Sequence, residues 1–204
     1  MACLPLLTFD FSPQTLFDST SERAELWRKH RAIYGADDHV IMALVEAPAD
    51  RADTWALLSE LEAQITARVP EVGQLKSLVS LPVPRSDAPG SVTIAPLADR
   101  LPATDSDAAA LASQARDHPL IAGTLISEDG SAVAVFMKAD DDVAAMAVVR
   151  PVVEELRAIA QELEGSHPGA RIHLLGPHPY RVTVVGVMIS EELRFVPLTG
   201  FVLF

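Results

Sequence analysis

The sequence predicts an α+β protein, a ferredoxin-like two-layer sandwich of βαββαβ type with a long Pro-rich insertion and a C-terminal connector helix. Three observations predict this class. Short apolar runs of strand length alternate with longer segments in which apolar residues recur every three or four positions. Proline is concentrated in one stretch, with six of the 15 prolines between Pro82 and Pro119. The last segment, Tyr180–Phe204, is apolar but too long for a strand, so we expect a helix there.

Composition is that of an ordinary globular domain and excludes several functional classes. The chain has 204 residues, of which 49% are hydrophobic and 22% charged, which excludes intrinsic disorder. Sixteen basic and 28 acidic residues give a net charge of −12, which argues against a nucleic-acid partner and against an anionic-lipid patch. The single cysteine, Cys3, cannot form an internal disulfide and excludes a thiolate zinc cluster.

The N-terminal part predicts an extended segment, a helix and a strand. Residues 1–18 have no helical period and contain two prolines, so we expect an extended lead-in. Ser19 and Glu22 have the spacing of a capping box and predict the start of a helix that ends at Gly35. Val40–Val45 is a nearly continuous apolar run, typical of a buried strand.

The middle of the chain predicts a second helix, a strand and a long surface excursion. Asp53 can cap a helix over Thr54–Val69, where apolar residues recur at steps of three and four. Gly73–Leu81 is predicted as a strand. Pro82–Pro119 is predicted as a surface excursion in which only Asp107–Arg116 is helical.

A hairpin is predicted next. Ile121–Ser127 and Ala132–Met137 are runs rich in β-branched residues on either side of Asp129-Gly130. Asp-Gly favours a type I′ turn, because both central residues of that turn have positive φ. These two strands give the βαββαβ plan one strand too many.

The last part predicts a helix, a strand and the C-terminal helix. The first helix follows the acidic run Asp140–Asp142, ends at Gly165, and is kinked or begun anew at Pro151. Arg171–Leu175 is the last short strand, and Gly176–Pro179 breaks the chain before Tyr180–Phe204. The helices near Thr54–Val69 and Val152–Glu164 are expected on one face of the sheet.

No established catalytic motif is present, and no catalytic, cofactor-binding or metal-binding residue is predicted. His167, His173 and His178 lie close in sequence, but prolines break their spacing, so solvated or capping histidines are favoured over a metal site. Asp140–Asp142 could bind a hard cation such as calcium. Because the run lacks alternating oxygen ligands, an acidic helix start is favoured.

Two further groups have alternative interpretations. Trp27 and Trp55 both lie on apolar helix faces, where core packing is favoured over ligand stacking. Glu191, Glu192 and Arg194 interrupt the apolar C-terminal run. In a membrane setting they would mark the water interface, and in a soluble domain they would be the solvated face of a helix.

Several short motifs follow one another in a recognisable order. They are Phe9-Asp10-Phe11-Ser12-Pro13, Tyr34–Asp38, Pro96–Pro102, His118–Gly130, Ile172–Pro177 and Glu191–Leu198. Together they resemble the first large periplasmic loop of exporters of the resistance-nodulation-division (RND) superfamily, in the branch of large-membrane-protein and hopanoid-type exporters. The resemblance covers nearly the whole chain.

The resemblance implies the periplasmic portion of a bacterial inner-membrane protein, a proton-driven exporter of lipids or other hydrophobic molecules. Residues 1–18 would follow a first membrane span, residues 19–180 would form a porter domain, and residues 181–204 would be a connector helix into a second span. The implied partners are the membrane-spanning part of the same chain, a second porter domain, and further copies of the chain in a homo-oligomer. No enzyme activity, cofactor or substrate-binding residue is implied for this segment.

The alternative is a free-standing soluble ferredoxin-like domain with a regulatory or small-ligand-binding role, because this fold hosts many functions. The uncharged run Phe195–Phe204 favours the exporter, since such a run suits the start of a membrane span. A hydrolase is disfavoured because no nucleophile and base occur at a recognisable spacing.

Overall fold

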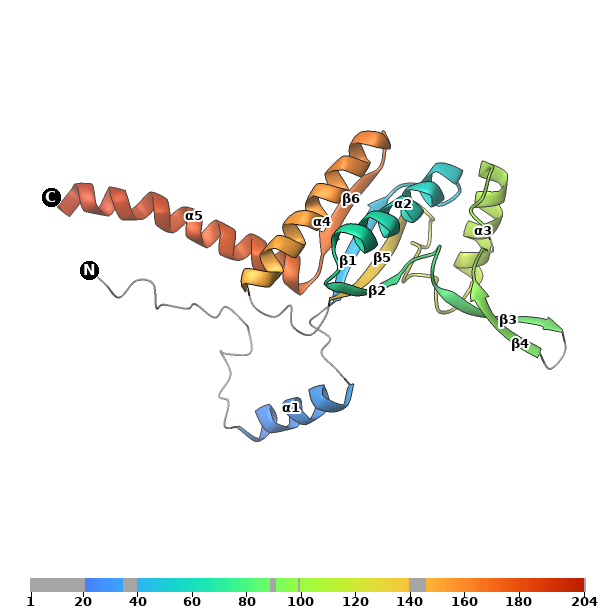
Figure 1. The fold of residues 1–204 in the computed structure, drawn as a ribbon, viewed down its shortest axis with the longest axis horizontal. Coiled ribbons are helices and arrows are strands. Elements are labelled where there is room, and N and C mark those ends of the chain that lie inside the picture. The colour runs from blue at the N-terminus through green and yellow to red at the C-terminus, as the bar shows by residue number, and fades with distance from the viewer. Residues whose placement is uncertain (1–20, 35–39, 89–90, 99, 140–145, 204) are drawn as a thin grey trace. The chain divides into compact units, whose positions relative to one another are not determined.

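The computed structural model describes residues 21–34, 40–88, 91–98, 100–139 and 146–203 (Figure 1). The chain divides into two compact units, residues 38–180 and residues 1–37 with 181–204. In chain order the elements are α1 (Glu22–Tyr34), β1 (Val40–Glu46), α2 (Ala52–Arg68), β2 (Val72–Lys76), β3 (Pro82–Ala88), β4 (Ser91–Pro96), α3 (Asp105–Asp117), β5 (Ala132–Ala139), α4 (Met146–Ser166), β6 (Arg171–Leu175) and α5 (Pro177–Leu203).

The predicted ferredoxin-like sandwich is confirmed within residues 38–180. Four strands form an antiparallel sheet in the order β2-β5-β1-β6. The chain thus runs β1-α2-β2, inserts other elements, and continues β5-α4-β6, which is the split βαβ arrangement of this class. Helices α2 and α4 both cover one face of the sheet (Figure 1).

The alternation of buried and less buried residues in β1 shows which face of the sheet packs against these helices. In β1, Ile41, Ala43 and Val45 are completely buried, whereas the residues between them are not. Because successive side chains of a strand point to opposite faces, the buried set faces α2 and α4. Trp55 of α2 is completely buried there, and its indole N–H donates to the Ala49 carbonyl at 2.8 Å. The predicted core role of Trp55 is therefore confirmed.

The Arg68 side chain links α2 and α4 at the surface of the helical layer. Arg68, in the last turn of α2, donates to Glu155 of α4 at 2.7 Å and also to Glu162. The hydrogen bond from Arg68 lowers the pKa of Glu162. These contacts offset the repulsion that two acidic residues on one helix face would otherwise feel.

The start of α2 differs from the prediction. Arg51, not Asp53, is the N-cap residue, and its side chain makes no capping hydrogen bond. The Ala52 N–H is instead bound by the Asp105 carboxylate at 2.9 Å, and Asp105 also pairs with Arg51 at 3.3 Å. The cap is supplied from the first residue of α3, so local sequence could not reveal it.

The insertion is more ordered than predicted. Pro82–Pro119 contains the helix that was expected, as α3, but also the antiparallel ribbon of β3 and β4. Prolines disfavour strands because they cannot donate to a ladder, and a two-stranded ribbon tolerates them on its outer edge. The predicted strand over Gly73–Leu81 is also corrected: β2 ends at Lys76, and Ser77 begins a turn in which its carbonyl accepts from the Leu81 N–H.

The predicted strand Ile121–Ser127 is wrong. Only isolated bridges occur there, and the N–H groups of Ala122 and Leu125 donate back to His118 and Ile121 in successive turns. The apolar residues of this run are buried as Ile121, Leu125 and Ile126, a spacing that is not the alternation of a strand. Without this strand, the predicted βαββαβ plan no longer has one strand too many.

The remaining elements agree with the sequence, with shifted ends. Helix α4 is continuous through Pro151, so a separate helix beginning at Pro151 is wrong. Strand β6 has the predicted bounds, and α5 confirms the C-terminal helix, although it begins at Pro177 rather than after a break. Helix α1 is confirmed, and the Ser21 hydroxyl accepts from the Ala24 N–H.

Several predictions fall outside the described residues. These are the lead-in over residues 1–18, the capping role of Ser19 and the acidic run Asp140–Asp142. The structure likewise does not describe the side chains of Trp27, Glu192 and Arg194.

Gly176 forms the junction between β6 and α5. Its φ of +121° is a conformation that residues with side chains rarely adopt, and a Cβ there would lie 2.7 Å from the Val40 carbonyl oxygen. Only glycine therefore lets the chain leave β6 alongside the start of β1 and enter a helix at the next residue.

We predict that Gly176→Ala destabilises the sandwich by about 1–3 kcal/mol, because the backbone strain and the close contact must be relieved. The matched control is Gly165→Ala, at a helical glycine where an added Cβ would meet no atom within 4 Å. The control should keep or raise stability, by up to about 1 kcal/mol. Urea unfolding of the three proteins measures both effects, and equal stability of the two variants would contradict the account of the junction.

Candidate functional site

Three loops meet at one end of the sheet, where β1 ends and both β5 and β6 begin. Glu46 is in register with Ala132 on one side and with Arg171 on the other. The loop after β1 is joined to the turn before β5 by a hydrogen bond from the Ala49 N–H to the Gly130 carbonyl, 2.8 Å long. Such loop clusters are frequent sites of function, because a rigid sheet positions them.

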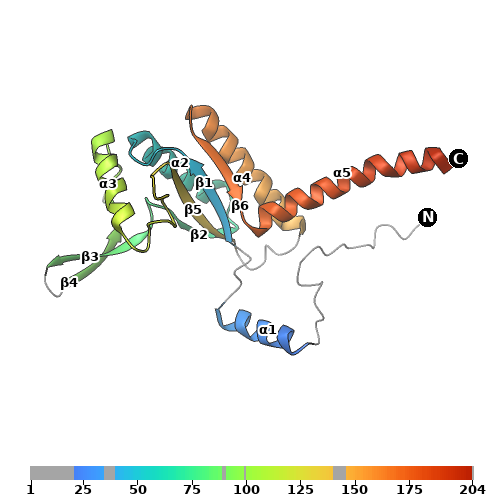
Figure 2. The same ribbon diagram turned by 180° about the vertical axis from the view of Figure 1, so that it is seen from behind.

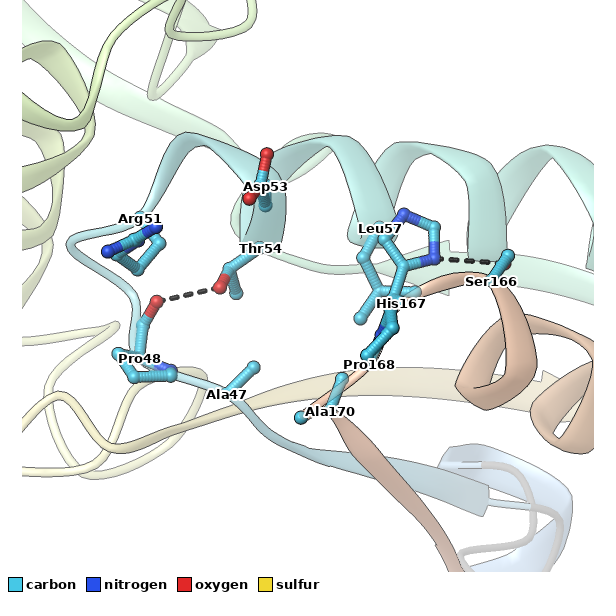
Figure 3. Close-up of a pocket in the computed structure, with 11 residues that line it drawn as sticks. Ala47, Pro48, Arg51, Asp53, Thr54, Leu57, Ser166, His167, Pro168 and Ala170 are labelled. Carbon is cyan, nitrogen blue, oxygen red and sulfur yellow. Dashed lines mark hydrogen bonds between the residues drawn. The ribbon is translucent and has the colours of Figure 1, made fainter.

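An open pocket of about 570 Å³ lies between two of these loops, the one leading into α2 and the one leading into β6 (Figure 3). Its lining residues are Ala47, Pro48, Arg51, Asp53, Thr54, Leu57, Ser166, His167, Pro168, Gly169 and Ala170. The lining mixes apolar residues with a few polar groups, as in small-molecule sites.

Most polar groups of the pocket hold the loops themselves. The Thr54 hydroxyl donates to the Pro48 carbonyl at 2.7 Å, which closes the loop before α2 (Figure 3). Arg51 is held by Asp105, outside the pocket lining. With Thr54 and Arg51 engaged in this way, few polar groups of the lining are left to bind a ligand.

Ser166 and His167 form the most chemically suggestive pair in the pocket. The Ser166 Oγ lies 3.1 Å from the His167 Nδ1 (Figure 3). The His167 Nε2 lies 3.9 Å from the Glu60 Oε2. Both side chains also approach the Leu163 carbonyl, Ser166 at 3.1 Å and His167 at 3.2 Å. A serine hydroxyl and an imidazole that share one carbonyl close the last turn of α4, and 3.9 Å is too long for the hydrogen bond of a catalytic triad.

The structure places the three histidines in different surroundings. His167 lies in the pocket, His173 lies on β6 with its Nε2 3.4 Å from Glu46, and His178 is buried in α5. Within the part of the chain that the structure describes, no three His, Cys, Asp or Glu side chains are grouped to hold a metal ion.

The second candidate site is the sheet face opposite α2 and α4 (Figure 2), which we call the open face. Cross-strand partners share a face, so the register determines which residues lie there. The middle row is Lys76, Phe136, Met42 and Leu175 from β2, β5, β1 and β6. The neighbouring rows place Val40 beside Lys138, and Leu44 beside Ala134 and His173.

The centre of the open face is apolar and its borders are charged. Val40, Met42, Leu44 and Phe136 are half-buried, and Leu175 is 41% exposed. Lys76 lies exposed on the outer strand β2, and Lys138 lies exposed near the end of β5. Glu46, Arg171 and His173 lie at the border near the loops. An apolar centre with a polar rim is the usual composition of a surface that packs against another domain.

No family model matches the chain, and no curated protein is significantly similar to it. Neither site was found from the sequence. The open face becomes visible only once strand pairing is known, because the nearly continuous apolar run of β1 does not tell which of its residues remain uncovered.

The turn before β5 shows how the loop cluster is held. The Asp129 carboxylate accepts hydrogen bonds from the hydroxyl groups of Ser127 and Ser131, at 2.6 and 2.8 Å, and from the Ser131 N–H. These donors lower the pKa of Asp129 to about 2. Only Gly130 of this turn has positive φ, so the predicted type I′ turn is wrong, because that type needs a second residue with positive φ.

We predict that Asp129 makes stability depend on pH in acid. A carboxyl group whose pKa is lower in the folded than in the unfolded protein stabilises the fold above its unfolded pKa of about 4, and this contribution is lost as the pH falls towards 2. Asp129→Asn should therefore lower stability at pH 7 and show a smaller loss between pH 4 and pH 2 than the unmodified protein. Urea midpoints measured along this pH range test it, and parallel curves would contradict it.

Proposed function

We propose that the chain is the first periplasmic porter domain of an RND-type exporter, which guides lipid-like or other hydrophobic substrates. Three features support the proposal: the resemblance of the motif order, the two-layer sandwich, and the open face. In this proposal the open face packs against the second porter domain of the same protein, because its apolar centre needs a cover.

The observation that carries the proposal is the direct passage from the last strand of the sandwich into a long helix. Helix α5 begins two residues after β6 ends and runs for 27 residues. In its described part Val187, Met188 and Ile189 are consecutive and all about half exposed, at 51%, 46% and 47%. A helix with exposed apolar residues on several sides suits a connector between a porter domain and a membrane span better than a surface helix of a soluble domain.

Among the residues that the structure describes, no helix combines the length and the apolar character needed to cross a bilayer. The proposed span would begin in the uncharged run Phe195–Phe204. Reading the coding sequence on both sides of this segment tests the proposal directly: about 20 apolar residues before and after it are expected. Polar flanks with stop codons would contradict it.

The alternative, a soluble regulatory or small-ligand-binding domain, draws its support from the pocket beside His167. Its volume of about 570 Å³ lies within the range of small-molecule sites. Under this alternative the open face and α5 would have no assigned partner, so we prefer the porter domain.

We predict that the exposed turn before β5 faces the periplasm in intact cells. In full-length protein carrying Cys3→Ser, Glu128→Cys should react with a membrane-impermeant maleimide before and after permeabilisation to the same extent, because Glu128 is exposed. Cys3→Ser alone is the control for background labelling. Reaction only after permeabilisation would place this loop in the cytoplasm and contradict the proposal.

We also predict that deleting Phe195–Phe204 leaves the sandwich folded, because these residues would face lipid or another span. The shortened chain should melt at the same temperature and aggregate less than the full chain. If the segment belonged to the core of a soluble domain, its removal would lose several buried side chains at about 1.5–3 kcal/mol each. A melting temperature lower by tens of degrees would then favour the soluble alternative.

A further inference from the structure

The ribbon of β3 and β4 has one outer edge that is blocked and one that is open. Pro84 is in register with Ile94, and a proline cannot donate the hydrogen bond that an exchanged pair requires. The N–H and C=O groups of Ile94 therefore point away from β3, and those of Val92, two residues earlier on the same strand, do so as well. On the opposite edge of the ribbon, Pro82 and Pro84 present no N–H groups.

The side chains of the ribbon are also unequally buried. Val83 is buried, at 2% exposure, so one face of the ribbon packs against its own unit. The other face carries Val92 and Ile94, each 72% exposed, together with the exposed prolines at 82, 84 and 96. The open edge of β4 thus lies beside an apolar face that nothing in the described part of unit 38–180 covers.

The outer strands of this protein differ in how they are protected from pairing. Strand β2 carries Lys76, β6 carries Arg171 and His173, and β3 carries two prolines, all of which oppose edge-to-edge association. Strand β4, Ser91–Pro96, has no charged residue, and its only proline is its last residue. An unprotected edge beside an apolar face is open to pairing with another strand.

We propose that β4 pairs antiparallel with β4 of a second copy of this chain, about a two-fold axis through Thr93. In this register Val92 of each copy faces Ile94 of the other, and the four outward N–H and C=O pairs are all satisfied. The two apolar faces join into one surface, and the ribbon grows from two strands to four.

A second copy suits this edge better than another occupant for two physical reasons. A two-stranded ribbon is stabilised when further strands extend it, and self-pairing gives the ribbon four strands while its buried face stays packed on its own unit. The chain has a net charge of −12, and the uncharged strand β4 lets two like-charged copies meet without placing charges opposite one another. This pairing is independent of the proposed exporter function, because it uses neither α5 nor the open face.

Cross-linking of the full chain tests the register. In the Cys3→Ser background, Thr93→Cys should form a disulfide-linked dimer under mild oxidation, because Thr93 is the one position that meets itself across the axis, at a Cα separation of about 4.5 Å. The matched control is Ala95→Cys, which would face Ser91 of the other copy. Equal or slower cross-linking of Thr93→Cys relative to Ala95→Cys would overturn the proposal.

Sedimentation velocity over a range of protein concentrations tests the contact itself. Ile94→Pro removes an outward N–H from each copy while leaving the ladder to β3 intact, so the dimer dissociation constant should rise at least about tenfold. A second test variant is Ile94→Lys, and its matched control is Leu120→Lys, at an apolar residue that is also exposed, at 66%. A chain that is monomeric throughout, or whose dimer is lost on deleting Phe195–Phe204 but not in Ile94→Pro, would overturn the proposal.

Discussion

The pairing of β1 with both β5 and β6 is the interaction on which the rest of the structure depends. It joins residues 40–46 to residues 132–138 and 171–175, which are far apart in sequence. Only this pairing presents Ile41, Ala43 and Val45 to α2 and α4 together, so the core cannot form without it. It also aligns the loop after β1 with the starts of β5 and β6, and it places the Val40 carbonyl against Gly176.

The sandwich buries one side of the sheet thoroughly and leaves the other side with an apolar centre. Burial of apolar surface stabilises a fold by about 25 cal/mol per Å², so the half-buried Met42, Leu44 and Phe136 represent stability that a partner could still supply. The charged residues lie at the borders of the open face and leave its centre apolar. A domain that packs against another domain would be built in this way.

Charge is arranged differently on the helical side. Arg68 ties α2 to Glu155 and Glu162 of α4, and Asp105 ties α3 to the start of α2. Each contact is solvent-exposed and worth little by itself. Together they orient three helices whose buried residues are mostly small or aliphatic, and such side chains specify orientation weakly.

Local sequence determined the elements whose period or punctuation is complete within a short window. The apolar stripe of α4, the run of β1 and the strand β6 were all predictable, because alternation and 3.6-residue periodicity follow from backbone geometry alone. From their order, the ferredoxin-like class could also be predicted. The C-terminal helix was predictable because its length excludes a strand.

Tertiary structure decided what local patterns leave open. Ile121–Ser127 has the composition of a strand but forms successive turns. These turns bury Ile121, Leu125 and Ile126 in the core, which a strand with alternating side chains would not do. Val92 and Ile94 belong to a strand despite the surrounding prolines, because β4 pairs with β3. Pro82 and Pro84 lie on the outer edge of β3 and leave the edge that faces β4 intact. The cap of α2 comes from Asp105, 53 residues beyond the helix start. The open face exists only through strand register, since a side chain's neighbours across a sheet are set by pairing, which no single segment encodes.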